Sequence, residues 1–135
     1  MIPVKKAMLA LLIVLVIIVL FEVIRTLSNP LTPSDDQLRS RFLEQTPLGT
    51  SMEDVIQSID SKKDWRIKYI DNDNGFTHQR KRPAEKIGVR HIRVHIGEYR
   101  VYSNLYFATD VVVFYGFNEN NELVDIWVRK DTDVL

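Results

Sequence analysis

The sequence predicts an α+β protein, in which an N-terminal transmembrane helix precedes two short helices packed on a four-stranded antiparallel sheet. Three observations predict this class. A long apolar run opens the chain, two stretches with helical spacing of apolar residues follow it, and four strand-like stretches come last, three that alternate apolar and polar residues and one that is continuously apolar. The chain has 135 residues, which leaves room for one domain after the apolar run.

The apolar run has the length of a membrane span. Residues 7–21 are uncharged, and the apolar stretch continues beyond Glu22 to Ile24. A helix over these 18 positions would span about 27 Å, close to the thickness of a hydrocarbon core. Glu22 lies near the end of the run, where a charge costs far less than at the centre. We therefore expect a retained anchor over residues 7–27, with the membrane contacted through residues 7–24.

Two alternatives stay open for this segment. The first is a cleaved signal peptide, because Thr26 and Ser28 are small residues that could precede a cleavage site before Asn29. Against it, Glu22 and Arg25 lie between the apolar run and that cleavage site. A buried core helix is the other alternative, and it would need partners on every side.

Flanking charges predict the orientation of the span. Lys5 and Lys6 precede it, whereas Arg25 is followed by two aspartates. The positive-inside rule places residues 1–6 in the cytoplasm. The remaining domain, residues 35–135, is then expected outside the cytoplasm, at the cell envelope.

A linker and two helices are expected next. Residues 28–34 hold two prolines, which predict a short stiff linker. Two capping-box patterns follow, each a serine or threonine with glutamine or glutamate three residues later. They predict helices over residues 35–45 and 51–62, capped by Ser34 and Thr50.

The rest of the chain predicts a sheet. Residues 71–75 are a turn cluster, and residues 76–88 are polar and expected to be irregular. An antiparallel sheet would bury one face under the two helices. Alternation of apolar and polar residues predicts three of its strands, at residues 65–69, 92–101 and 124–128, and the apolar run at residues 111–117 predicts the other.

Composition excludes several function classes. The chain has no cysteine, so disulfides, thiolate metal sites, a cysteine nucleophile and N-terminal lipid attachment through cysteine are excluded. Basic and acidic residues number 18 each, which argues against a nucleic-acid partner. We expect no cofactor.

Two histidines have a spacing that can hold zinc on a helix. His91 and His95 are four residues apart. The surrounding residues predict a strand, on which the two rings would start about 13 Å apart with Arg93 between them. We therefore expect solvent-facing histidines and no metal site.

One stretch is strongly basic. Residues 78–100 hold seven basic and two acidic residues. This bias predicts contact with an anionic lipid headgroup or polyanion through residues 80–100. The alternative is a solvated loop and strand face.

Aromatic residues are interleaved with arginines near the end of the second strand. Aromatic and arginine side chains are enriched in interface hot spots, although core packing and cross-strand packing are the alternative. We expect a protein partner that contacts the sheet face and its loops. The predicted contact residues are Arg90, Arg93, Tyr99, Tyr102, Tyr106 and Trp127.

Patterns for catalysis are weak. Residues 49–51 lack the flanks of a nucleophile elbow, and both hydroxyls suit helix caps better. Residues 71–75 resemble a calcium loop but lack the downstream glutamate. We expect no catalytic residue.

The order of elements resembles small helix–helix–sheet domains. Gly49, Ser51 and Val55 match the helix start found in the small lipoprotein of the outer-membrane assembly machinery and in the repeats of β-lactamase-inhibitor protein. The resemblance covers about residues 35–130 and includes a late two-stranded hairpin. It implies a binding or scaffolding module without catalysis. The lipid-bearing cysteine of the lipoprotein is absent here.

The sequence therefore predicts a membrane-anchored, extracytoplasmic binding or scaffolding module that is not an enzyme. An inhibitor or immunity-type protein, which blocks a toxin or enzyme at the membrane, is the alternative. A hydrolase that uses His91 or His95 is a third hypothesis.

Overall fold

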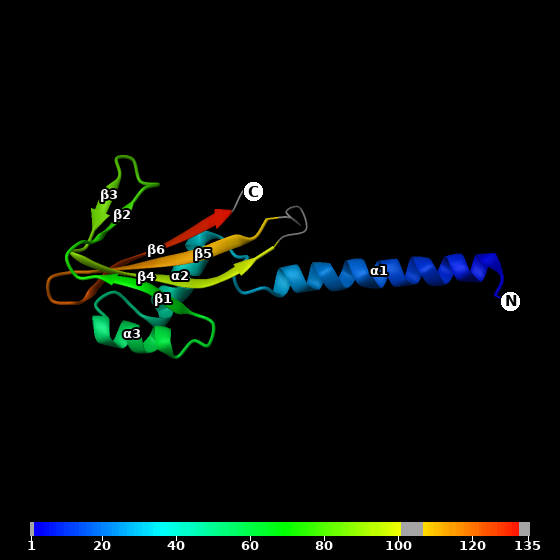
Figure 1. Cartoon of the computed structure of the whole chain (residues 1–135), viewed down its shortest axis with the longest axis horizontal. Coiled ribbons are helices and arrows are strands. Elements are labelled where there is room, and N and C mark those ends of the chain that lie inside the picture. Colours follow the sequence, from blue (N-terminus) through cyan, green and yellow to red (C-terminus); the bar gives the residue numbers. More distant parts are fainter. Residues whose placement is uncertain (1, 101–106, 133–135) are drawn as a thin grey trace.

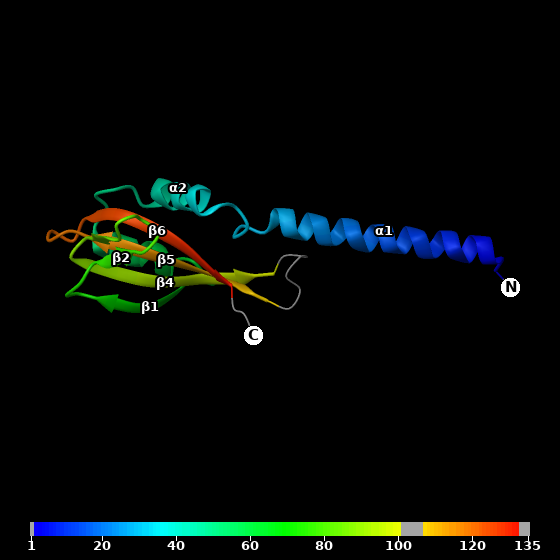
Figure 2. The same cartoon turned by 90° about the horizontal axis from the view of Figure 1, so that it is seen from above.

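The long N-terminal helix stands apart from a small α+β domain (Figure 1). The structure is a computed structural model, and it describes residues 2–100 and 107–132, with the side chain of Thr26 left out. Helix α1 (Val4–Ser28) is exposed along its length. Its segment Val4–Arg25 is long and apolar enough to cross a membrane, judged by length and composition. The helix leaves the domain at the end opposite the β5–β6 turn (Figures 1 and 2).

The linker after α1 packs onto the domain. Leu31 lies against the hydrophobic core, and its backbone N–H donates to the side chain of Asn29 (2.9 Å). From the last strand, the Nζ of Lys130 donates to the carbonyl oxygens of Pro33 (2.5 Å) and Thr32 (3.4 Å). These contacts fix the end of α1 beside the sheet.

Helix α2 (Asp35–Gln45) begins with the predicted capping box. The backbone N–H of Gln37 donates to the hydroxyl of Ser34 (3.3 Å), and the backbone N–H of Ser34 donates to the side chain of Gln37 (3.2 Å). Leu38 and Phe42 are the buried residues of the helix. The capping-box prediction is therefore confirmed.

Replacing Ser34 with alanine should lower the free energy of unfolding by about 1 kcal/mol, because one helix N–H loses its acceptor. Urea unfolding of the full chain in detergent micelles measures the change. Ser40→Ala is the matched control, since Ser40 is an exposed serine in the same helix whose hydroxyl donates to the carbonyl of Asp36. Equal losses in the two variants would contradict the capping assignment.

Helix α3 (Met52–Asp60) is capped by Ser51, one residue later than predicted. The hydroxyl of Ser51 accepts from the backbone N–H of Asp54 (3.2 Å). The backbone of Thr50 is instead hydrogen-bonded to the start of the last strand: its carbonyl oxygen accepts from the N–H of Leu123 (2.8 Å). The capping role expected for Thr50 was therefore wrong.

Four antiparallel strands form the main sheet, in the order β1-β4-β5-β6. They are β1 (Arg66–Asp71), β4 (Arg90–Tyr99), β5 (Thr109–Phe117) and β6 (Leu123–Thr132). The prediction of two helices on a four-stranded antiparallel sheet is confirmed. Strands β1, β5 and β6 are longer than predicted, and β4 begins two residues earlier than predicted.

The two faces of this sheet have different covers. Helices α2 and α3 pack on one face, which we call the helix face. The main core lies between these helices and the sheet. Leu38, Val55 and Ile59 meet strand residues there, and Val94 and Val113 are fully buried at the centre. Burial on this scale supplies the main stabilisation of the domain.

The opposite face is partly covered by a small hairpin that the sequence did not predict. Strands β2 (Phe76–His78) and β3 (Glu85–Ile87) pair antiparallel within the segment expected to be irregular. Figure 1 shows this hairpin above the sheet and α3 below it. Three-residue strands are too short to show alternation, so the period-two signal was absent.

Candidate binding surface

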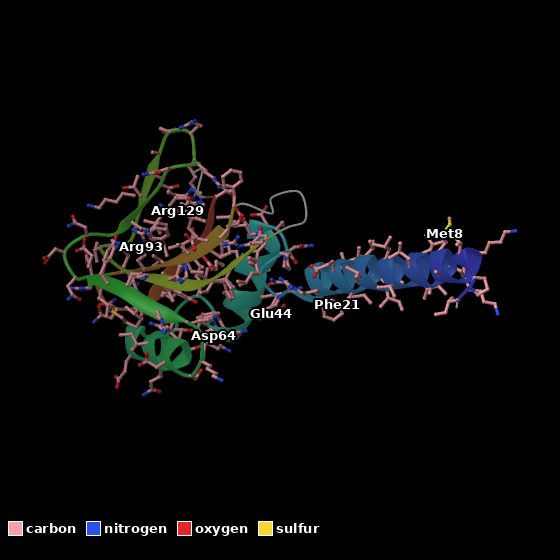
Figure 3. All side chains as sticks on the ribbon, turned by 45° about the vertical axis from the view of Figure 1, so that its right-hand side comes forward. Met8, Phe21, Glu44, Asp64, Arg93 and Arg129 are labelled. Atoms are coloured by element: carbon pink, nitrogen blue, oxygen red, sulfur yellow. The ribbon has the colours of Figure 1, made fainter. Side chains whose placement is uncertain are left out.

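The face of the sheet on the side of the hairpin carries the charged and aromatic side chains of the strands, and we call it the outer face. Alternation along each strand places these side chains opposite to the helix face. Figure 3 labels Arg93 and Arg129 on this side and Asp64 on the side of the helices. The residues of the outer face are Tyr69 of β1, His91, Arg93 and His95 of β4, Asp110, Val112 and Phe114 of β5, and Asp125, Trp127, Arg129 and Asp131 of β6.

Tyr69 reaches the outer face because of an irregularity in β1. The register between β1 and β4 shifts between Ile67 and Tyr69. Ile67 packs against the core on the helix face, whereas the Tyr69 ring contacts His91 edge-on at 5.6 Å. The regular alternation expected for residues 65–69 was therefore wrong at Tyr69.

The half of the outer face under the hairpin is a second, aromatic core. Trp127 stacks on Phe114 with 5.1 Å between ring centroids and on Phe76 with 6.2 Å. Ile87 and Val112 complete this cluster of buried residues. Trp127 is only 5% exposed, so the hairpin and the sheet hold each other through these rings.

His91 is buried in the same half. It is 6% exposed, and its Nδ1 lies 2.8 Å from the carbonyl oxygen of Asn74. The expectation of a solvent-facing histidine was therefore wrong at this position. The hairpin explains the difference, since the ring of Phe76 covers His91 edge-on at 6.4 Å.

His78 of the hairpin stacks flat on Trp127, with 4.5 Å between ring centroids. Its Nδ1 is buried and has no hydrogen-bond partner within the described part of the chain. Burial lowers the pKa of His78, and the positive charge of Lys81 lowers it further. The folded protein therefore favours the neutral ring.

Acidification below pH 6.5, the ordinary pKa of histidine, should weaken the hairpin. In that range the unfolded chain binds a proton that folded His78 resists, so stability falls as the pH decreases. Urea unfolding of the full chain in micelles at about pH 7.5 and about pH 5.5 measures the loss. His78→Phe keeps a stacked ring and should reduce the loss, while an unchanged loss would contradict the assignment to His78.

Residues of the outer face line a cavity of about 500 Å³. Strands β1, β4, β5 and β6 all contribute to its walls. Charged side chains dominate, with one aromatic ring and one aliphatic side chain among them. The lining residues are Lys68, Tyr69, Arg93, His95, Asp110, Val112 and Asp131.

Arg93 forms a cationic wall of the cavity and is held by aromatic rings. Its guanidinium carbon lies 5.6 Å from the ring centroid of Phe114 and 5.9 Å from that of Tyr69. The Nε of Arg93 is buried and has no hydrogen-bond partner among the described residues. Stacking on rings fixes a guanidinium without using its hydrogen-bond donors.

The two carboxylates of the cavity already have basic partners. Asp110 lies 3.1 Å from the Nε2 of His95, and Asp131 accepts from the Nε of Arg129 at 2.8 Å. In residues 2–100 and 107–132, by contrast, neither Lys68 nor Arg93 forms an ion pair within 4 Å. Within these residues, the cavity therefore offers two cations without ion-pair partners, beside two carboxylates that each contact a basic side chain.

The six predicted contact residues do not form one surface in the part that is described. Arg93 and Trp127 share the outer face, although Trp127 is covered by the hairpin. Tyr99 packs against the core of the helix face, with Lys130 over its ring at 5.2 Å. Tyr102 and Tyr106 lie outside the described residues.

The sixth residue, Arg90, holds a turn. Its Nη1 donates to the side chain of Asn121 (3.0 Å) and to the carbonyl oxygen of Asn118 (3.3 Å). Both partners belong to the β5–β6 turn. These bonds occupy the guanidinium in stabilising that turn.

Besides Val112, five cavity residues with polar side chains were not among the predicted contacts. Asp110 and Asp131 lie outside the predicted strands, and regular alternation would put Lys68 and Tyr69 on opposite faces. Strand order was not predicted either. In the structure, β4 lies between β1 and β5, and this arrangement brings the side chains together. They are Lys68, Tyr69, His95, Asp110 and Asp131.

The basic stretch is partly neutralised within the chain. Arg80 pairs with Asp35 (2.5 Å), and Lys81 pairs with Glu85 (2.8 Å). The predicted headgroup contact of residues 80–100 stays a prediction. Across residues 2–100 and 107–132, no group of three or more His, Asp or Glu side chains is placed to hold a metal ion.

The protein has an α+β domain with two helices on one face of its sheet. The other face carries a cavity in which Lys68 and Arg93 have no ion-pair partner in the part of the chain that the structure describes. Comparison with protein-family models, with curated proteins and with solved structures gives no match. The function of the protein is therefore inferred from the geometry of this chain.

Proposed function

We propose that this protein is a single-pass, membrane-anchored binding module that presents its outer face to a protein partner outside the cytoplasm. Its role is to bind or scaffold, without catalysis. The observation that carries the proposal is the cavity with two unpaired cations, Lys68 and Arg93, on a domain joined to an exposed apolar helix. An inhibitor would use the same surface, with a toxin or enzyme as its partner.

The helix supports the anchoring part of the proposal. None of the apolar window of α1 is buried by the domain. Burying such a surface requires a bilayer or another protein. Lys5 and Lys6, in the first turn of α1 ahead of its apolar run, support a cytoplasmic N-terminus.

The cavity supports the binding part. Charged side chains that lack partners keep their hydrogen-bonding capacity for a ligand. Aromatic rings beside arginine are a common composition of interface hot spots. The open half of the outer face provides both, since Arg93 contacts Tyr69 and Phe114.

Reporter fusions test the anchoring. A C-terminal fusion to a reporter that is active only outside the cytoplasm should be active, and the fusion should migrate at full size. A loss of about 3 kDa would indicate a cleaved signal peptide. Activity of a reporter that works only in the cytoplasm would overturn the proposed orientation.

Photo-crosslinking in cells tests the binding surface. A photo-reactive amino acid replaces Lys68 at the rim of the cavity, and the matched position is Gln57, exposed on α3 at the other side of the domain. A discrete cross-linked protein is expected from position 68 and not from position 57. Cross-links of equal yield from both positions, or from neither, would contradict the proposal.

A further inference from the structure

We infer that the cavity of the outer face receives a carboxylate side chain from an extended acidic segment of the partner, through Arg93 and Lys68. This inference rests on the proposed binding function and names the chemistry of the same site. Three features of the cavity support it: the presentation of Arg93, the charge balance and the neighbouring strand edge.

Arg93 is presented as a fixed donor. Its guanidinium is held by Phe114 and Tyr69, and its Nε points into the protein. The terminal nitrogens are therefore the donors that remain for a ligand at the cavity wall. A planar guanidinium that is already ordered loses little freedom when it binds a carboxylate.

The charge balance selects an anion over a cation. An acidic ligand meets two cations without ion-pair partners among the described residues, Lys68 and Arg93, whereas a basic ligand would meet carboxylates that already contact basic side chains, Asp110 beside His95 and Asp131 beside Arg129. The ion pair of Asp131 with Arg129 also reduces the repulsion of an incoming carboxylate by Asp131.

The size and walls of the cavity fit a peptide side chain with apolar neighbours. About 500 Å³ is within the range of small-ligand pockets. Tyr69 and Val112 provide apolar surface beside the cations. A glutamate flanked by aliphatic residues matches these walls.

The edge of the sheet explains why the segment should be extended. Strand β1 is an outer strand of the four-stranded sheet, and Lys68 and Tyr69 of this strand line the cavity. A segment running along β1 would direct alternate side chains over the outer face. One of them then reaches the cavity.

Nuclear magnetic resonance of the full chain in zwitterionic micelles tests this inference. The probes are the tripeptides acetyl-Val-Glu-Val-amide and acetyl-Val-Gln-Val-amide, which differ only in charge. The side-chain Nε–H signal of Arg93 is expected to shift and saturate with the glutamate probe, with a Kd on the order of 1 mM. The glutamine probe should bind about tenfold more weakly. Equal binding of both probes would overturn the inference.

Variants assign the binding to the cavity. Arg93→Gln should abolish binding, and Lys68→Gln, on an exposed side chain, should weaken it about threefold. Lys81→Gln is the matched control, since Lys81 pairs with Glu85 on the hairpin, and it should change nothing. If Arg93→Gln does not fold, Lys68→Gln still decides, because full affinity in that variant would overturn the inference.

The two proposals fail differently. If the glutamate probe does not bind while a cross-linked partner forms at position 68, the outer face binds its partner and the carboxylate inference is wrong. If the probe binds but the cross-link and the external reporter signal are missing, the anchored binding module is wrong and the anion site remains.

Discussion

Replacing Trp127 with alanine is expected to lower the free energy of unfolding by about 3–5 kcal/mol, the usual cost of deleting a large buried aromatic side chain. Trp127 is 5% exposed and stacks on Phe114, Phe76 and His78. Without this ring, β2 and β3 lose most of their attachment to β6. Urea unfolding of the full chain in micelles measures the loss through the fluorescence of Trp65, the tryptophan that remains.

The control for this variant is Val124→Ala. Val124 lies on the same strand but is 37% exposed, so its truncation should cost well below 1 kcal/mol. Hydrogen exchange should also be faster at the amides of β2 and β3 in Trp127→Ala and unchanged in the control. A loss as small as that of the control would show that the hairpin does not depend on the aromatic cluster.

Replacing Gly75 with alanine is expected to cost about 3 kcal/mol, at the upper end of ordinary overpacking. The new methyl group would collide with the backbone carbonyl oxygens of Ile87 and Gly88. These atoms belong to the end of β3 and the residue after it, so the base of the hairpin must move apart. Chemical shifts of the Phe76 and Ile87 amides report that displacement, and urea unfolding reports the cost.

Gly49 offers the matched control for Gly75. It has a positive φ of 92°, and no atom lies within 4 Å of the position that a new methyl group would occupy, so alanine there meets backbone strain alone. We expect about 1–2 kcal/mol for Gly49→Ala and no shift of the hairpin amides. Unperturbed hairpin amides in Gly75→Ala would contradict the collision.

Local patterns were sufficient to predict most elements of the fold. The capping box at Ser34 and the apolar spacing of Val55 and Ile59 correspond to α2 and α3. Alternation predicted β1, β4 and β6, whereas β5 was predicted from its continuous apolar run, because both of its faces are buried. These signals are short-range, and a single sequence displays them directly.

The hairpin could not be predicted in the same way. Strands β2 and β3 contribute only Phe76 and Ile87 to the second core, which is too few apolar residues for a periodic pattern. Their burial depends on Phe114 and Trp127, which are distant in sequence. The exposure of His91 was misjudged for the same reason, since the ring that covers it comes from the hairpin.

The candidate site shows the same limit. Alternation placed Arg93 on one strand face with His91 and His95, as observed. The partners of Arg93 depend on strand order and on the register shift in β1 that turns Tyr69 toward it. Both properties arise from long-range pairing, which local patterns do not encode.

The attachment of the linker has a consequence for how a partner arrives. Leu31 and the bonds from Lys130 hold the end of α1 against the sheet, and the strands run roughly along the axis of α1 (Figures 1 and 2). If α1 crosses a bilayer along the membrane normal, the sheet stands perpendicular to the membrane. Its outer face is then directed toward neighbouring proteins in the same membrane and not toward the lipid surface. Proteins tethered in the same membrane would meet it by diffusion in two dimensions, which raises their effective concentration over that of a free protein.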